Sequence, residues 1–215
     1  MFILKDIPVF TTIYGAASLI LYQIPFTRTA YIRLQSTQSP EEFLAECVDF
    51  CVMAGAESVY ATGDVWLERF PIATSIISMS CDDLLYPETD AYAMSIQEKD
   101  LTDFKQIYNA AMAKIPNAEC MSTNKLLQIL RAGNCYYVFK DNRKIGIGIA
   151  EGDCLESIIA IEPGMGQDVL AALYCVMKKD LIRIEVASAN ERAVRFFTKN
   201  GFKQNGVISN WYKVF

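Results

Sequence analysis

The sequence predicts an α/β fold, a mixed sheet of the α+β kind with helices on its faces. Segments with strand and helix periodicity alternate between residues 91 and 215, which is typical of such folds. Hydrophobic residues make up 52% of the 215 residues and charged residues 21%, enough apolar mass for one large core or two small ones. A second alternation before residue 90 predicts an additional N-terminal α/β subdomain.

An acidic segment with a proline, from Asp82 to Asp90, separates two apolar regions of the chain. Such a change of composition is typical of a domain boundary. We therefore expect two domains, residues 1–90 and residues 91–215.

Local signals predict each element of the C-terminal domain. Asp100 opens a helix that Pro116 stops, and Ser122 or Thr123 caps a second helix. The dipeptide Asp141-Asn142 predicts the turn of a hairpin. The other expected elements are strands at residues 92–96, 136–139, 144–149, 155–161 and 182–186 and helices at 167–177 and after Asn190.

The end of the chain is its most informative segment. Residues 182–186 alternate in polarity and run into Asn190; Ala193, Phe196 and Phe197 then fall on one face of a short helix that Asn200-Gly201 closes. This order of strand, asparagine turn, helix and Gly-Phe resembles the end of the GNAT N-acetyltransferase superfamily. The resemblance extends over residues 91–215, because the order of the expected elements is also that of the GNAT fold.

The resemblance implies a GNAT-like acyltransferase fold with acetyl-CoA as co-substrate. In the family, the strand ending in Ile161-Glu162-Pro163 offers its backbone to the pantetheine arm. The Gly164-Met165-Gly166 turn then presents helix N–H groups to the pyrophosphate. The cofactor-binding residues that the resemblance implies are Ile159, Ile161, Gly164, Met165, Gly166, Gln167, Asp168, Asn190, Phe196 and Phe197.

Two features depart from the family pattern. The residues that usually separate the proline from the glycines are missing, so the phosphate loop is expected to be short. Phe197 stands where the family often has a tyrosine that gives a proton to the departing thiolate. Loss of a general acid costs about 10²–10⁴-fold in rate, so activity is expected to be weakened.

Glu156 is the expected general base, with Glu162, Glu151 and Asp153 as further candidates. In an alternating strand Glu156 shares a face with Ile158 and Ala160, and apolar neighbours would raise its pKa. The alternative is a solvated position at a strand edge.

Three further residues, Asn190, Arg195 and Lys199, also have two possible roles. Asn190 either caps its helix and contacts the cofactor or is only a cap. Arg195 and Lys199 either reach the nucleotide phosphates or remain solvated on the helix surface.

Composition excludes several classes of function. The chain has no histidine, which rules out Ser-His-Asp and Cys-His catalysis and any histidine-ligated metal site. Seven cysteines without a C-x-x-C pair fit neither a disulfide framework nor a zinc knuckle, so a cytoplasmic protein without metal is expected. A net charge of −5 without a basic stripe argues against nucleic acid as a partner. The uncharged residues 7–26 are interpreted as buried strands, and no membrane partner is expected.

The first ninety residues hold a similar order of elements. Two strands, at residues 9–13 and 18–24, precede a strand at 30–34, a helix that Ser39-Pro40-Glu41-Glu42 opens with a capping box, and a strand at 58–61. We interpret this as a degenerate, partial GNAT-like repeat. It should not bind coenzyme A, because Glu41 and Glu42 would repel phosphate. Its expected roles are to extend the sheet, to enclose the acceptor site or to form a homodimer surface.

Three hypotheses follow. The first is acetyl transfer from acetyl-CoA to a small-molecule or peptide amine by direct attack. The second is a catalytically weak or inactive module that binds acyl-CoA as a sensor. The third is an interaction scaffold without a small-molecule site.

Overall fold

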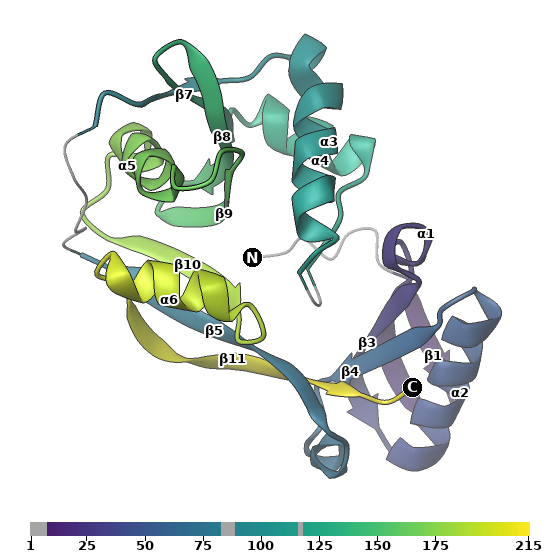
Figure 1. Ribbon diagram of the computed structural model, residues 1–215. Helices are drawn as coiled ribbons and strands as arrows, with labels where there is room; N and C mark the ends of the chain where they lie inside the picture. Colours follow the sequence, from purple (N-terminus) through teal and green to yellow (C-terminus); the bar gives the residue numbers. More distant parts are fainter. Residues whose placement is uncertain (1–7, 83–88, 116–117) are drawn as a thin grey trace. The chain divides into compact units, whose positions relative to one another are not determined.

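The computed structural model describes residues 8–82, 89–115 and 118–215 (Figure 1). The chain forms two compact units, one of Met1–Ile76 with Val207–Phe215 and one of Ile77–Gly206. Strands β5 (Ile72–Cys81) and β11 (Lys203–Lys213) each run from one unit into the other. These units are not divided at residues 90 and 91, where the sequence predicts a domain boundary. The predicted boundary stays a prediction.

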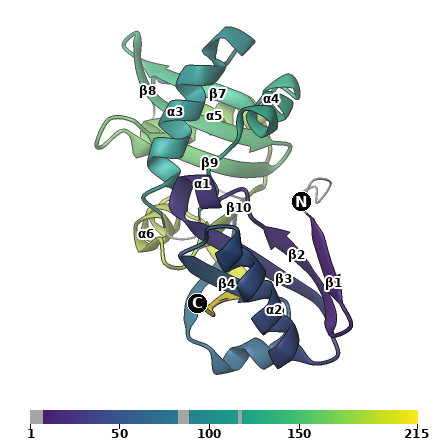
Figure 2. The same cartoon turned by 90° about the vertical axis from the view of Figure 1, so that its right-hand side faces the viewer.

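The first unit is a sheet with the strand order β1-β2-β3-β4-β11. Neighbouring strands are antiparallel except β3 and β4, which are parallel. The long helix α2 connects these two strands along the chain. Figure 2 shows α2 lying along this sheet. The elements are β1 (Val9–Thr12), β2 (Gly15–Ile20), α1 (Ile24–Thr27), β3 (Thr29–Thr37), α2 (Pro40–Met53), β4 (Ser58–Thr62) and the 3-10 helix η2 (Val65–Arg69).

One face of α2 forms the core of this unit. Phe43, Leu44, Cys47 and Cys51 are buried against the sheet. Ser39 is the N-cap residue, as expected, but its side chain makes no capping hydrogen bond, so the predicted capping box is wrong. The helix start is instead fixed by Pro40 at its first position, whose φ is already helical.

The second unit has the strand order β11-β5-β10-β9-β8-β7-β6. Strands β6, β7, β8 and β9 are antiparallel to one another in that order, whereas β9 and β10 are parallel. The elements are β6 (Tyr92–Ser95), the 3-10 helix η3 (Glu98–Asp100), α3 (Leu101–Met112), α4 (Thr123–Arg131), β7 (Cys135–Lys140), β8 (Arg143–Glu151), β9 (Cys154–Ala160), α5 (Gly166–Met177), β10 (Ile182–Ala187) and α6 (Glu191–Lys199).

Helices cover both faces of this second sheet (Figure 1). Phe104 of α3 and Leu126 of α4 pack with Ile147 and Ile149 on one face. On the other face α5 lies so close to β8 that a Cβ on Gly148 would be 2.4 Å from a Leu173 methyl carbon. The α3/α4 face and the α5 face of the sheet are therefore distinct, and each has its own core.

The parallel strands β9 and β10 are paired at one position only, between Cys154 and Arg183. The Arg183 N–H donates to the carbonyl of Asp153 at 2.8 Å, and beyond this point no register pair joins the two strands among the described residues. The backbone of β9 facing β10 is therefore unpaired from residue 155 onward.

The mixed α/β fold is confirmed. The uncharged segment, residues 7–26, was interpreted as strands; its described part contains β1, β2 and the first residues of α1. No helix of the described residues is both long and apolar enough to cross a membrane. Strand β5 and helix α1 were not expected. The Asp141-Asn142 turn is confirmed, with φ of 50° and 58°, the left-handed values of a two-residue hairpin turn.

Candidate functional site

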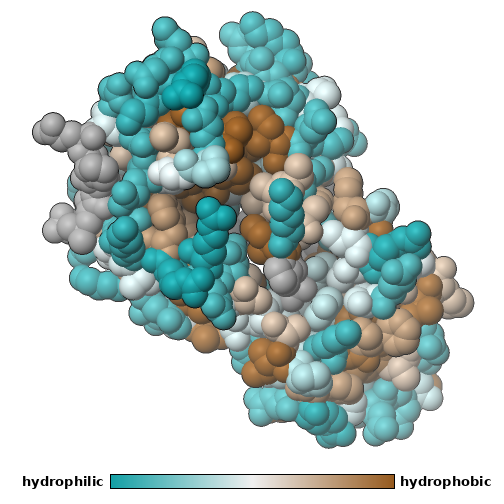
Figure 3. Space-filling view, in the orientation of Figure 1, coloured by the Kyte–Doolittle hydropathy of each residue, from teal (hydrophilic) through white to brown (hydrophobic). Residues whose placement is uncertain are grey.

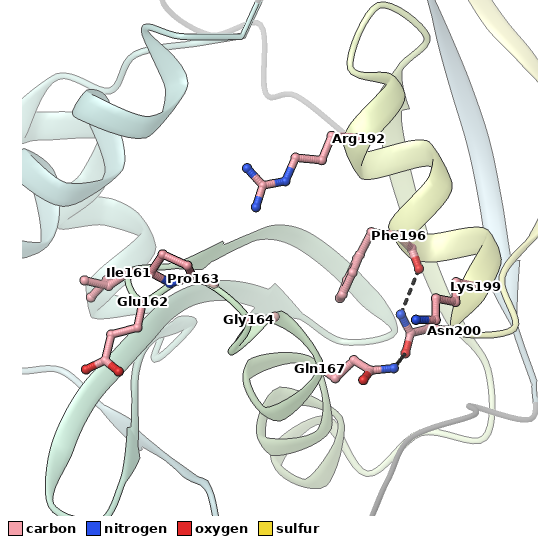
Figure 4. A pocket seen from close by; sticks show the side chains of 11 residues that line it. Ile161, Glu162, Pro163, Gly164, Gln167, Arg192, Phe196, Lys199 and Asn200 are labelled. Atoms are coloured by element: carbon pink, nitrogen blue, oxygen red, sulfur yellow. Dashed lines mark hydrogen bonds between the residues drawn. The ribbon is translucent and has the colours of Figure 1, made fainter.

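A cavity of about 460 Å³ lies where β9 ends and α5 begins (Figure 4). Its walls come from the end of β9, the turn that follows, the first turn of α5 and one face of α6. The lining residues are Ala160, Ile161, Glu162, Pro163, Gly164, Gly166, Gln167, Arg192, Phe196, Lys199 and Asn200. All of them belong to the second unit.

The turn between β9 and α5 is short, as the sequence predicted. Only five residues, 161–165, separate the two elements. Gly164 has a φ of +88°, which an L-residue rarely adopts. At Gly166 a Cβ would lie 3.1 Å from the Phe196 ring, so glycine allows α5 to begin directly beside α6.

The first turn of α5 presents free backbone donors. Its N-cap residue, Met165, makes no side-chain capping bond, and the first helical N–H with a backbone acceptor is that of Val169, which donates to the Met165 carbonyl at 3.0 Å. Among the described residues, no hydrogen-bond acceptor is found for the N–H groups of residues 166–168. Free N–H groups at the positive end of a helix dipole favour an anion.

Two cations from α6 face the same cavity. Arg192, Phe196 and Lys199 lie at positions i, i+4 and i+7 of the helix, so they share one face. Figure 4 shows the Arg192 side chain extending over the cavity. Neither cation forms an ion pair with any residue that the structure describes, whereas Arg195 pairs with Glu191 at 2.9 Å. Of these two candidate phosphate ligands, Lys199 therefore lines the cavity and Arg195 does not.

Sequence reasoning missed Arg192 and Asn200. The i, i+4, i+7 spacing with Phe196 and Lys199 is the signal that could have found Arg192. Asn200 was considered only as a helix stop, because its role depends on a contact with α5 that the sequence does not show.

Asn200 joins the two helices at the cavity. It is completely buried, its Nδ2 donates to the Phe196 carbonyl at 2.8 Å, and its Oδ1 accepts from Gln167 Nε2 at 3.2 Å. Both hydrogen bonds are drawn in Figure 4. A buried amide with both ends satisfied holds the start of α5 at the end of α6.

Three residues of the implied cofactor set, Asp168, Ile159 and Met165, do not line the cavity. Asp168, although in the first turn of α5, accepts from Thr89 Oγ1 and pairs with Lys140 at 2.9 Å. Burial alone would raise the pKa of Asp168, but these two hydrogen bonds outweigh it and lower the pKa. Ile159 packs toward the α3/α4 core, and Met165 packs against the α5 core.

The aromatic pair of α6 divides between cavity and core. Phe196 lines the cavity, whereas Phe197 is buried with its ring 5.2 Å from that of Phe202. Neither ring carries a hydroxyl group that could give a proton to a leaving group.

Asn190 is the N-cap of α6, as predicted, and its Oδ1 accepts from the Ala193 N–H at 3.2 Å. It also lines a second, smaller cavity of about 270 Å³, together with Lys114, Ile115, Ala189, Glu191 and Arg192. Arg192 thus borders both cavities.

Glu156 sits on a β-bulge. Ile149 pairs with Ser157 and the next residue, Ala150, pairs with Leu155, which leaves Glu156 unpaired between them. The bulge breaks the alternation, so the expectation that Glu156 shares a face with Ile158 and Ala160 is wrong. Ile158 is paired with Gly148, which faces α5.

The charge of Glu156 acts on the other face of the sheet. Burial is the main cause of the raised pKa of Tyr108 and of Cys135, both in the α3/α4 core, and the negative charge of Glu156 adds to it in each case. The pKa of Glu156 is itself raised, mainly by loss of hydration and then by the charge of Glu151. Its side chain is exposed, so desolvation is partial, yet the direction of the shift suits a base that must accept a proton from an amine.

Two of the other candidate bases, Glu162 and Asp153, lie close to arginine side chains. Glu162 lines the cavity, but its carboxylate points away from Arg192 and Lys199 (Figure 4) and lies 3.6 Å from Arg143. Asp153 pairs with Arg183 at 2.7 Å.

In the space-filling view, apolar side chains lie between polar ones in the part of the second unit that carries β8 and β9 (Figure 3).

No protein-family model and no curated protein sequence matches the chain. Solved structures do. A conserved protein of unknown function from Staphylococcus epidermidis superposes with a TM-score of 0.57 at 12% identity, over 99% of this chain and 96% of that one. A GCN5-related N-acetyltransferase from Sphaerobacter thermophilus gives a TM-score of 0.57 at 10% identity, over 92% of this chain and 76% of the other.

The chain has the GNAT fold. A tandem GNAT protein from the clavulanic acid biosynthesis pathway also superposes, with a TM-score of 0.54 at 10% identity, over 94% of this chain and 78% of that one. These GNAT structures match nearly the whole chain, so the likeness of fold extends beyond residues 91–215. The interpretation of the first ninety residues as a degenerate repeat stays a prediction.

Proposed function

We propose that the protein is an N-acyltransferase that transfers the acetyl group of acetyl-CoA to a primary amine. The observation that carries the proposal is the divergence of β9 from β10, which leads to a cavity with helix N–H groups and two cations that have no partner among the described residues. An extended ligand with amides at one end and phosphates at the other fits this arrangement.

The pantetheine arm of coenzyme A carries two amides, and the unpaired backbone of β9 offers them partners, as a strand edge does for a peptide. The N–H of Ile161 is not available to this ligand, because it already donates to the Ile145 carbonyl at 2.8 Å. The pyrophosphate would bind at residues 166–168, between Arg192 and Lys199.

Glu156 is proposed as the base. Its carboxylate takes a proton from the acceptor ammonium, and the neutral amine then attacks the thioester carbonyl. The nitrogen gives its second proton to water, the carbon–sulfur bond breaks, and the thiolate of coenzyme A leaves and takes a proton from water. The hydrocarbon rings of Phe196 and Phe197 support this route, because they offer no acid to the thiolate.

The same rings favour a second candidate function, a module that binds acyl-CoA without turnover and acts as a sensor. Without a proton donor the rate is expected to fall by about 10²–10⁴-fold. The cofactor site is common to both candidates, and only amine-dependent release of free thiol separates them.

The acceptor is proposed to be a small-molecule or peptide amine, and the compartment the cytoplasm, with neither nucleic acid nor membrane as a partner. For residues 1–90 we propose a degenerate, partial GNAT-like repeat that extends the sheet, encloses the acceptor site or forms a homodimer surface. Its order of elements supports this, because a hairpin, a strand, the helix α2 and a parallel strand repeat the order of β7 to β10.

Calorimetric titration with acetyl-CoA tests the proposal. Each phosphate contact from a cation is worth about 1.5–3 kcal/mol in a hydrogen bond to a charged group, and exposure of Arg192 and Lys199 reduces this. Arg192→Gln and Lys199→Gln should each weaken binding about tenfold. Arg195→Gln, with the same change of charge on the same helix, is the matched control and should bind acetyl-CoA as the wild type does.

Pantetheine provides a control on the ligand side, because it lacks the phosphates. Its affinity should be the same for the wild type and for both cavity variants. No saturable binding of acetyl-CoA by the wild type at millimolar concentration would refute the proposal and leave the scaffold hypothesis.

A further inference from the structure

The first turn of α5 carries an acidic side chain beside its free N–H groups. Asp168 is the third residue of this helix, and the N–H groups of residues 166–168, which we call the phosphate seat, find no acceptor among the described residues. A carboxylate in the first turn of a helix is attracted to such groups, because it is an anion at the positive end of the helix dipole. Asp168 is therefore a competitor, within the chain itself, of any anion that binds at the phosphate seat.

The 3-10 helix η3 shows the hydrogen bond that a carboxylate at this position makes. Asp100 is the third residue of η3, and its Oδ2 accepts from the N–H of the N-cap residue Gln97 at 3.1 Å. Asp168 has the same position relative to Met165, the N-cap residue of α5, yet the Met165 N–H donates to the Glu162 carbonyl at 3.3 Å. The Asp168 carboxylate binds other partners instead, so the two helix starts differ.

Two side chains from other segments bind the Asp168 carboxylate. Its Oδ1 accepts from Thr89 Oγ1 and, at 2.9 Å, from Nζ of Lys140 at the end of β7. The Asp168 side chain is 16% exposed and that of Lys140 28%, so this ion pair is partly shielded from water. Lys140 also lies 3.5 Å from Asp90, whose side chain is 66% exposed. Asp168 is therefore the closer and less hydrated partner of Lys140.

The Asp168 carboxylate is ionised at neutral pH, and its charge is offset. Burial raises the pKa of Asp168, but the hydrogen bonds from Thr89 and Lys140 outweigh it and lower the pKa. The Lys140 ammonium supplies the compensating positive charge. Without it, a full negative charge would remain in the first turn of α5, where it would repel a bound phosphate and attract the N–H groups that the phosphate needs.

We propose that Thr89 and Lys140 are positioning residues of the phosphate seat, because they bind the Asp168 carboxylate and keep it away from the free N–H groups of α5. Neither residue lines the cavity, so both act through Asp168. The inference rests on the proposed function, because it takes the anion to be the pyrophosphate of acetyl-CoA. It adds that the affinity for this anion depends on a side chain 79 residues before Asp168.

Lys140→Met tests the positioning role, because it removes the ammonium and leaves the Asp168 carboxylate without its counter-charge. Calorimetry measures the binding of acetyl-CoA, inorganic pyrophosphate and pantetheine to the full-length protein. The variant should bind acetyl-CoA and pyrophosphate about three- to thirtyfold more weakly, which is the range for a charge near a helix end. Pantetheine has no phosphate, so its affinity should not change.

Two rescues separate positioning from a structural role. Asp168→Asn removes the ion pair as completely as Lys140→Met does, yet it should bind acetyl-CoA at least as tightly as the wild type, because no competing charge remains. Added to Lys140→Met, it should restore the affinity for both phosphate ligands. Lys140→Arg keeps the charge and should bind as the wild type does. Thr89→Val, a second variant of similar size, should bind about two- to tenfold more weakly, and Asp168→Asn should restore this loss as well.

Lys144→Met is the matched control for the loss of one positive charge. Lys144 pairs with Asp103, and its Nζ lies 3.8 Å from the centre of the Tyr137 ring. Tyr137 belongs to the α3/α4 core, on the face of the sheet opposite to α5. The control loses an ion pair of the same kind, but its affinity for acetyl-CoA and for pyrophosphate should equal that of the wild type.

Three results would overturn the positioning role: wild-type affinities in Lys140→Met, a loss that Asp168→Asn does not restore, or a wild type that binds neither acetyl-CoA nor pyrophosphate at millimolar concentration. The proposed function is judged separately by acetyl-CoA. Acetyl-CoA binding that Lys140→Met does not weaken would sink the positioning role alone. Pyrophosphate binding with the expected loss and rescue, but without acetyl-CoA binding, would retain the positioning role and refute the transferase.

Discussion

Replacement of Asn200 by alanine tests how the cavity is held together. The change removes two buried hydrogen bonds, one to the Phe196 carbonyl and one from Gln167. Each is worth about 0.5–1.5 kcal/mol, so the loss in free energy of unfolding should be about 1–3 kcal/mol. For a chain of this length 1 kcal/mol lowers the melting temperature by about 2–4 °C, so the midpoint should fall by about 4–8 °C for a loss of about 2 kcal/mol.

Thermal unfolding followed by circular dichroism measures this effect, and Asn205→Ala is the control. Asn205 is exposed and its side chain bonds only to Ser80 among the described residues, so its loss should change stability by less than about 0.5 kcal/mol. A double-mutant cycle with Gln167→Ala should give a coupling energy of about 0.5–1.5 kcal/mol.

The same variant should bind acetyl-CoA several-fold more weakly, because the start of α5 is no longer tied to α6. An Asn200→Ala protein that melts with the wild type, or strict additivity with Gln167→Ala, would refute the assigned role of this side chain.

Three further predictions concern packing, charge and thiol reactivity. Gly148→Ala should lower the free energy of unfolding by about 1–3 kcal/mol through overpacking, because the new Cβ would lie 2.4 Å from a Leu173 methyl carbon. An unchanged midpoint of urea unfolding would contradict the close approach of α5. Asp168→Asn should lower stability at neutral pH, and the difference from the wild type should fade as the pH falls below about 4. The lowered pKa of this carboxyl gives stability that is present above its ordinary pKa and lost as the wild type protonates; a difference that persists at pH 2 in acid unfolding would argue against it. Of the seven cysteines only Cys175 is exposed, so a thiol reagent should modify one group rapidly in the folded protein and none in Cys175→Ser.

The C-terminal half of the fold could be predicted because its signals are local. Strands and helices there have apolar residues at regular spacing, and Ser122 and Asn190 cap their helices with the predicted side-chain bonds. The short turn before α5 could also be predicted from the sequence, because its length follows from the number of residues between a proline and two glycines.

The missing parts depend on contacts that are distant in sequence. Strand β5 lies between β10 and β11 in the sheet, more than a hundred residues along the chain, although buried Ile77, Met79 and Cys81 alternate within it. The bulge at Glu156 depends on the register with β8, which alternation in a single strand cannot show. The tie from Asn200 to Gln167 likewise requires that two helices meet.

Hydrogen exchange with and without acetyl-CoA tests the central claim most directly. Because the N–H groups of residues 166–168 and the β10-facing edge of β9 lack partners within the described chain, they should exchange rapidly in the free protein. Saturating acetyl-CoA should slow exchange in both segments and leave α2 unchanged. Saturable binding that protects neither segment would contradict the account, because it would place the cofactor elsewhere.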